Sequence, residues 1–123
     1  MTETKNVAVL GATPKKDRYA HLAMKMLKEC GYRPVPINPA FDEVLNEKCF
    51  RSIAEAPQPI HTLTMYVGAA RSEPLIPEIL KARPRRIIFN PGAENDHLAA
   101  EAQSQGIEVV KGCTLVMLRT GTF

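Results

Sequence analysis

The sequence contains no tryptophan, and aromatic residues make up only 6% of its 123 positions. Proteins that bind single-stranded nucleic acid commonly stack bases on aromatic side chains, which are scarce here. The net charge of +3 is too small an excess for a nucleic-acid surface and suits a small anionic molecule. We therefore expect a small-molecule ligand and no nucleic-acid partner.

Long apolar runs are also missing. No stretch approaches the roughly 20 apolar residues that a membrane-spanning helix needs. The first residues, Met1 to Lys5, lack the apolar core of a signal peptide. We expect no membrane partner and a cytoplasmic location.

Cysteine is sparse and shows no metal-binding spacing. The three cysteines are an odd number without a C-x-x-C pair, which argues against a disulfide framework and a structural zinc site. The three histidines lie far apart and show no ligand spacing such as His-x-x-x-His. The sequence therefore predicts no metal site.

Apolar β-branched segments alternate with amphipathic segments along the whole chain, a pattern typical of α/β proteins. The predicted strands are 6–10, 32–37, 60–67, 86–89 and 107–110. The predicted helices are 19–30, 72–82 and 94–105, with short helices near 52–55 and at the start of the tail 113–123. We expect one domain over 1–123, with a doubly wound, Rossmann-like parallel sheet of five strands between two helix layers. The expected strand order is 3-2-1-4-5, which puts the ligand crevice between the loops after strands 1 and 4.

The first predicted helix has a clear apolar stripe, with Asp17 as its candidate N-cap and Gly31 as its C-terminal cap. Its predicted buried face consists of Tyr19, Leu22, Ala23, Met26, Leu27 and Cys30. His21 lies outside this stripe, whereas Cys30 on the stripe is most simply a core residue. The sequence leaves open whether Cys49 is buried and whether Cys113 is functional or structural.

The loop from Gly11 to Arg18 carries the strongest functional signal. Gly11 permits a sharp turn that brings backbone N–H groups close to an anion. The helix that follows points its partly positive N-terminus into the same region. Thr13 adds a hydroxyl donor, and Lys15 and Lys16 add positive charge. A tight turn with solvated lysines is the structural alternative, and we favour phosphate binding.

Two common nucleotide motifs are absent. A dinucleotide site needs G-x-G-x-x-G and an acidic residue roughly 20 positions later. Here Thr13 occupies the place of the second glycine, and Asn38 ends the second strand where the acid should stand. The P-loop pattern G-x-x-x-x-G-K-[ST] does not occur either. An NAD(P)- or nucleotide-binding module therefore remains only as an alternative.

Four features, in this order and spacing, resemble the small bacterial coenzyme A-binding proteins. They are V-A-V-L-G-A-T-P-K-K-D-R at 7–18, G-Y-R-P-V-P-I-N-P at 31–39, N-P-G-A-E-N at 90–95, and Cys113 after the last strand. The resemblance covers 6–115 and implies the fold of the CoA-binding domain of the succinyl-CoA synthetase α subunit.

The resemblance implies roles for individual residues, which we group by the part of coenzyme A that each would contact. Those for the phosphates are Gly11, Ala12, Thr13, Lys16 and Arg18. Those for the ribose and adenine are Asn38, Pro39, Val67, Gly68 and Arg71. Those for the pantetheine arm and its thiol are Asn90, Pro91, Gly92 and Cys113.

No nucleophile–base pair can be identified from the spacing, so we assign no catalytic residue. In succinyl-CoA synthetase the phosphorylated histidine lies outside the domain that this chain resembles. The resemblance therefore implies non-catalytic binding of coenzyme A or an acyl-CoA by a carrier, sensor or regulator. The alternative is an enzyme or enzyme subunit that acts on a CoA thioester or thiol through Cys113. The apolar run from Leu115 to Leu118 would suit a homodimer.

Overall fold

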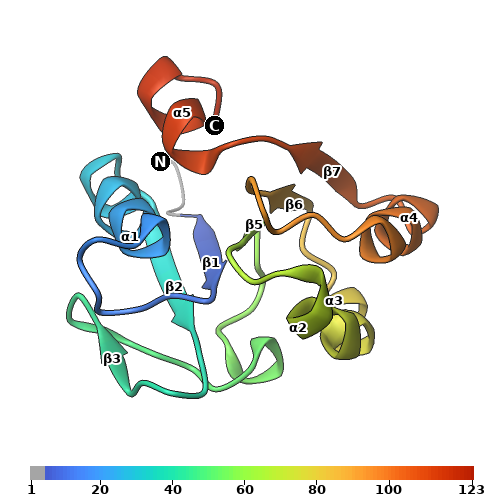
Figure 1. Cartoon of the computed structure of the whole chain (residues 1–123), viewed down its shortest axis with the longest axis horizontal. Helices are drawn as coiled ribbons and strands as arrows, with labels where there is room; N and C mark the ends of the chain where they lie inside the picture. Colours follow the sequence, from blue (N-terminus) through green and yellow to red (C-terminus); the bar gives the residue numbers. More distant parts are fainter. Residues whose placement is uncertain (1–4) are drawn as a thin grey trace.

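The computed structural model describes residues 5–123 and places a five-stranded sheet between two layers of helices (Figure 1). The sheet strands are β1 (Asn6–Leu10), β2 (Arg33–Ile37), β5 (Thr62–Met65), β6 (Arg86–Phe89) and β7 (Glu108–Lys111). All four pairings between neighbouring strands are parallel. The predicted α/β, doubly wound fold class is confirmed.

The strand order across the sheet is β2-β1-β5-β6-β7. Counted along the chain, this order is 2-1-3-4-5, so β5 pairs with β1 and does not lie outside β2 as the expected order 3-2-1-4-5 requires. Within β2, the Ile37 carbonyl accepts a hydrogen bond from Gly11 N–H on the β1 side, whereas the Pro36 carbonyl faces the outer edge. Pro34 and Pro36 therefore present their nitrogens, which lack a hydrogen, to that edge. A further strand could not pair there fully, so β2 is an edge strand.

The observed strand order changes the expected position of the ligand crevice. The direction of winding reverses between β1 and β5, because β2 lies on one side of β1 and the later strands lie on the other. Ligands of doubly wound sheets bind beyond the carboxyl ends of the strands at such a reversal. The loops after β1 and β5 therefore flank the crevice, instead of the loops after β1 and β6.

Helix α1 (Tyr19–Glu29) buries a different face from the predicted one. Its buried residues are Ala20, His21, Ala23, Met24 and Leu27. Tyr19 is 72% exposed and Cys30 is also exposed, so the assignment of Cys30 to the core was wrong. Two overlapping sets of positions on this helix have helical spacing. The set that is buried, with Ala20, Ala23, Met24 and Leu27, packs against Val7 and Val9 of β1. The N-cap is Arg18, without a side-chain capping bond, so Asp17 does not cap the helix.

The other helices follow the predicted order with shifted bounds. They are α2 (Ala69–Ser72), α3 (Ile76–Ala82), α4 (Asp96–Ser104) and α5 (Thr114–Thr120), with 3₁₀ turns at Ile53–Glu55 and Glu73–Leu75. The predicted helix 72–82 begins earlier and is interrupted by the second 3₁₀ turn, which contains Pro74. A small hairpin of β3 (Glu43–Val44) and β4 (Glu47–Lys48) was not predicted. Within residues 5–123, the helices are too short to span a bilayer.

Each face of the sheet carries its own hydrophobic cluster. Helices α3 and α4 pack on one face, and α1 packs on the other, where α5 also lies (Figure 1). In the apolar tail, Leu115 is buried and Leu118 packs against the α1 cluster, which leaves Val116 51% exposed. Most of that tail therefore stabilises the fold of its own chain.

Candidate functional site

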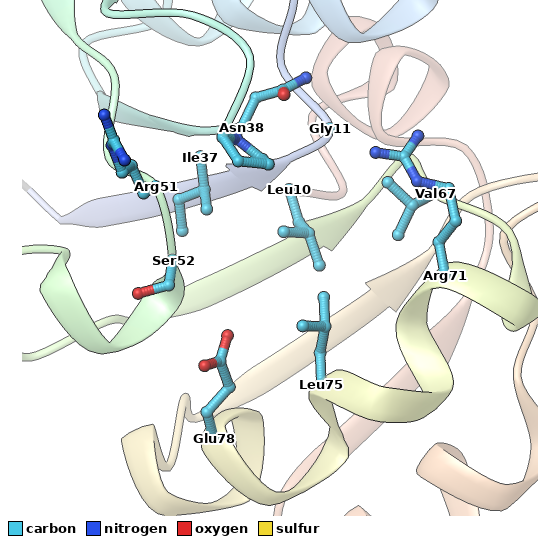
Figure 2. Close-up of a pocket in the computed structure, with 11 residues that line it drawn as sticks. Leu10, Gly11, Ile37, Asn38, Arg51, Ser52, Val67, Arg71, Leu75 and Glu78 are labelled. Carbon is cyan, nitrogen blue, oxygen red and sulfur yellow. The ribbon is translucent and has the colours of Figure 1, made fainter.

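Two pockets open at the carboxyl edge of the sheet. The first, which we call the loop pocket, has a volume of about 430 Å³. It is lined by Gly11, Thr13, Lys15, Arg18, Tyr19, Ala20, Asn38, Phe41, Tyr66, Arg71, Pro91, Gly92 and Ala93. The second, the apolar pocket, has a volume of about 310 Å³ (Figure 2). It is lined by Leu10, Gly11, Ile37, Asn38, Pro39, Arg51, Ser52, Val67, Arg71, Leu75 and Glu78.

Gly11 shapes the junction of the two pockets. Its φ of +96° lies in a region that favours glycine, and a Cβ there would stand 2.9 Å from Val67 Cγ1 and 3.1 Å from the Tyr66 carbonyl oxygen. The turn after β1 therefore lies directly against the end of β5. Gly11 N–H donates to the Ile37 carbonyl at 2.9 Å, so this amide is not free for a ligand. Donors to an anion must come from later residues of the loop and from the start of α1.

Side chains from two other elements hold the loop after Gly11 in place. Asn38 Nδ2 donates to the Ala12 carbonyl at 2.9 Å, and Asn38 Oδ1 accepts from Ala40 N–H at 2.9 Å. His21 Nδ1 lies 3.0 Å from the Thr13 carbonyl, to which it donates. His21 is 6% exposed and was predicted to lie outside the buried face. These contacts fix the loop before any ligand arrives, which lowers the cost of binding.

The loop pocket is positively charged. Lys15, Arg18 and Arg71 line it, and its lining includes no acidic residue. Helix α1 begins beside it with no acid in its first turn and no side-chain cap, so the partial positive charge of its N-terminus is not offset there. Lys16 is exposed and lines neither pocket. This arrangement suits a phosphate or pyrophosphate group.

The side chain of Asn90, directly after β6, forms its hydrogen bonds with other residues of the protein. Its Nδ2 donates to Thr64 Oγ1 at 2.7 Å and to the Met65 carbonyl at 2.8 Å, and its Oδ1 accepts from Thr114 N–H at 2.8 Å. The side chain is buried and lines neither pocket, so it ties the loop after β6 to β5 and to the start of α5. The neighbouring Pro91 and Gly92 do line the loop pocket.

Tyr66 and Cys113 lie close to this buried network. The Tyr66 hydroxyl is buried and has no hydrogen-bond partner among the described residues. Burial raises the pKa of Tyr66 to about 12, although the nearby Thr114 hydroxyl acts in the opposite direction. Cys113 is a half-buried free thiol at the N-cap of α5 and lines neither pocket.

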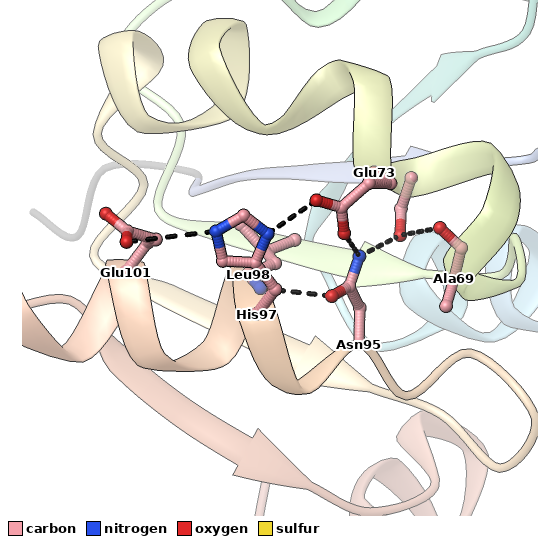
Figure 3. A network of polar contacts seen from close by, with 7 residues as sticks. Ala69, Glu73, Asn95, His97, Leu98 and Glu101 are labelled. Atoms are coloured by element: carbon pink, nitrogen blue, oxygen red, sulfur yellow. Dashed lines mark hydrogen bonds and ion pairs between the residues drawn. The ribbon is translucent and has the colours of Figure 1, made fainter.

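A polar network fixes the helix that carries Arg71 (Figure 3). Asn95 caps α4 by accepting from Leu98 N–H at 3.0 Å, and its Nδ2 donates to Ser72 Oγ of α2 at 2.8 Å. His97 pairs with Glu73 at 2.5 Å and lies 3.9 Å from Glu101. These contacts join α2 to α4. They therefore fix the position of α2, whose Arg71 lines both pockets.

The structure gathers most of the sequence-predicted residues around the two pockets. Those that line at least one are Gly11, Thr13, Arg18, Asn38, Pro39, Val67, Arg71, Pro91 and Gly92. Those that line neither are Ala12, Lys16, Gly68, Asn90 and Cys113. The lining residues that sequence reasoning missed include Tyr66, Arg51, Ser52, Leu75 and Glu78.

The missed residues had only weak signals in the sequence. Arg51 and Ser52 follow an unpredicted hairpin, whereas Leu75 and Glu78 belong to a segment that was predicted as one helix and is divided by a 3₁₀ turn. Metal ligation does not explain any of them: residues 5–123 contain no group of three or more His, Cys, Asp or Glu side chains that could hold a metal ion.

The chain is similar in sequence to proteins that are described as binding or using coenzyme A. A family model described as a CoA binding domain matches residues 5–119. The protein YneT of Bacillus subtilis is 33% identical over 110 residues, which cover 89% of this chain and 82% of YneT. An ADP-forming acetate–CoA ligase of Methanocaldococcus jannaschii is 32% identical over 63 residues, which cover 51% of this chain but only 9% of the ligase.

A solved structure shows the same architecture over the whole chain. The crystal structure of an uncharacterized protein superposes with a TM-score of 0.88 at 38% identity, and the match covers 99% of this chain and 100% of that one. The matched segment of 5–119 includes both pockets and the loop after β1. The chain thus belongs to the CoA-binding domain family, which is related to the CoA-ligase subunits.

Proposed function

We propose that this protein binds coenzyme A or an acyl-CoA without catalysing its conversion, as a carrier, sensor or regulator. The observation that carries the proposal is that a cationic pocket and an apolar pocket adjoin at one edge of the sheet. Gly11, Asn38 and Arg71 line both the cationic loop pocket and the apolar pocket. Coenzyme A combines an adenosine with a pyrophosphate, and these two parts need an apolar and a cationic site side by side.

The proposed pose follows the lining residues. The pyrophosphate lies in the loop pocket near Thr13 and Arg18, where the start of α1 supplies amide donors. The adenosine enters the apolar pocket, with Pro39 and Val67 on its walls. The pantetheine arm leaves along Pro91 and Gly92. Of the residues implied for this ligand, Asn90 supports the loop from behind and does not contact the arm.

A role for Cys113 in acyl or thiol transfer is the first alternative. The residue starts α5 and is fixed in place, because the N–H of the following Thr114 donates to Asn90 Oδ1 at 2.8 Å. No histidine is hydrogen-bonded to the Cys113 thiol in residues 5–123, and the thiol lies outside both pocket linings. We therefore favour binding without catalysis over this alternative.

The NAD(P)-binding alternative is disfavoured by the end of β2. A site for NAD needs an acidic side chain there to accept hydrogen bonds from the ribose. This chain has Asn38, whose amide nitrogen is already committed to the Ala12 carbonyl. Coenzyme A should therefore stabilise the protein more than NAD does.

A homodimer is a further proposal. Val116 is 51% exposed on α5, and Leu22 is 37% exposed on α1, which contacts α5. Analytical ultracentrifugation of the wild type and of Val116→Glu tests the proposal. A dimer that the variant converts to a monomer would support it, and a monomeric wild type would overturn it.

The function is tested with freshly purified protein in two steps. Native mass spectrometry should detect a co-purified ligand near the mass of coenzyme A. Thermal unfolding is then followed with coenzyme A, acetyl-CoA or NAD, because ligand at 100 times its Kd adds about 2.7 kcal/mol of stability. A larger rise in Tm with NAD than with coenzyme A would contradict the proposal. Turnover of acetyl-CoA by the pure protein would favour the enzyme alternative.

A further inference from the structure

The segment that follows the β3–β4 hairpin places Arg51 at the site. After β2 the chain forms the β3–β4 hairpin and returns, and Phe50 then bridges to Ile37 in parallel. Phe50 N–H donates to the Pro36 carbonyl at 2.9 Å, and Asn38 N–H donates to the Phe50 carbonyl at 2.9 Å. These two backbone bonds fix the position of residue 51 beside the carboxyl end of β2.

Arg51 is an exposed residue at the rim of a pocket with an apolar floor. Leu10, Ile37 and Leu75 lie across the floor of the apolar pocket between its two arginines (Figure 2). Glu78 is the acidic residue in the lining, and it projects from α3 at the opposite wall. No carboxylate of residues 5–123 forms an ion pair with Arg51. An anion in this pocket would therefore meet an available guanidinium.

The two pockets divide the cations between them. Lys15 and Arg18 line only the loop pocket, and Arg71 lines both. Arg51 lines only the apolar pocket and not the loop pocket, in which the proposed pose places the pyrophosphate. A ligand that uses every cation must therefore carry a second anionic group on the adenosine side. Figure 2 shows Arg51 and Arg71 on opposite sides of Asn38.

Resting on the proposed function, we propose that Arg51 recognises the 3′-phosphate of coenzyme A and sets the preference for coenzyme A over dephospho-CoA. Coenzyme A carries this second phosphate on the ribose of its adenosine, and dephospho-CoA lacks it. A guanidinium can donate two parallel hydrogen bonds to a phosphate, which makes arginine a selective partner for this group. Arg51 is thus a specificity-determining residue and has no part in holding the pyrophosphate.

The test compares the two ligands by isothermal titration with four proteins. The wild type should bind coenzyme A about tenfold more tightly than dephospho-CoA, as expected for loss of a hydrogen bond to a charged group. Arg51→Gln should weaken coenzyme A alone and so abolish the preference. Arg71→Gln should weaken both ligands, because that residue borders both pockets. Arg33→Gln is the matched control, because Arg33 is exposed at the opposite end of β2.

The possible results separate this inference from the function on which it rests. If the wild type binds neither ligand, the proposed function fails and the role of Arg51 fails with it. If coenzyme A binds but Arg51→Gln weakens both ligands equally, coenzyme A binding stands and the inference is overturned. Loss of the preference in Arg71→Gln or Arg33→Gln, with Arg51→Gln unchanged, also overturns it. Arg51→Lys should retain part of the preference, because it keeps the charge but loses the paired donors.

Discussion

Asn38 at the end of β2 donates a hydrogen bond of 2.9 Å from Nδ2 to the carbonyl oxygen of Ala12, which lies 26 residues earlier in the chain. This contact joins the loops after two neighbouring strands at the point where both pockets meet. Asn38 therefore holds the loop after β1 in place and lines both pockets at the same time.

Replacing Asn38 by alanine should therefore affect stability and binding together. Loss of the hydrogen bond to Ala12 should lower the free energy of unfolding by about 1 kcal/mol. Coenzyme A should bind about tenfold more weakly, because the loop is no longer held in one conformation. Urea unfolding and isothermal titration measure the two effects. An unchanged affinity with lowered stability would show that Asn38 supports only the fold.

Gly11→Ala should be more damaging than the same change at another glycine with positive φ. The new Cβ would lie 2.9 Å from Val67 Cγ1 and 3.1 Å from the Tyr66 carbonyl oxygen, in addition to the strain of a φ of +96°. Gly106→Ala is the matched control, since Gly106 has a φ of +80° and the added Cβ would have no atom of residues 5–123 within 4 Å. We expect a loss of about 1 kcal/mol at Gly106 and more at Gly11. Equal losses in urea unfolding would contradict the close approach of β1 and β5.

Thr13→Asp should abolish coenzyme A binding with little loss of fold. The side chain lines the loop pocket, so a carboxylate there would repel the phosphates. Lys25→Gln lowers the net charge by the same amount at an exposed position of α1, away from both pocket linings, and should leave the affinity nearly unchanged. Isothermal titration measures the affinity of both variants for coenzyme A. Unchanged affinity in Thr13→Asp would show that the loop after β1 does not bind the phosphates.

Asn90→Ala should destabilise the fold strongly, by about 2–4 kcal/mol. The change removes three hydrogen bonds and leaves the N–H of Thr114 and the Met65 carbonyl without their partner. Gln103→Ala, at an exposed position on α4, should cost far less. Thermal unfolding measures the difference, and a small effect at Asn90 would mean that the network contributes little to stability.

Tyr66→Phe should leave stability unchanged or raise it, because it removes a buried hydroxyl that has no hydrogen-bond partner within residues 5–123. It should also change the response to alkaline pH. The pKa of Tyr66 is raised by burial from 10.0 to about 12, so between these values the unfolded chain loses this proton and the folded chain keeps it. Stability should therefore fall as pH rises from 10 to 12 in the wild type, and fall less steeply in the variant. Parallel curves for the two proteins would contradict the raised pKa.

The sequence alone determined the order along the chain of the five sheet strands and of the main helices, the α/β class and the position of the glycine turn after β1. These follow from local signals, such as the apolar run of β1 ending at Gly11, which depend on residues near one another in the chain. The edge position of β2 was also encoded locally by Pro34 and Pro36, but the expected strand order did not use that signal. The family resemblance implies a ligand-binding role for the same loop.

Tertiary structure decided the pairing of β5 with β1, the buried face of α1 and the real partners of the site residues. Helical period alone could not choose between two overlapping stripes on α1, because packing against Val7 and Val9 makes that choice. Asn90 turned inward because Thr64 and Thr114, which are far from it in sequence, offered it buried partners. Arg51 reached the apolar pocket only because Phe50 pairs with Ile37. Contacts between distant residues depend on the whole packed chain, and no local pattern specifies them.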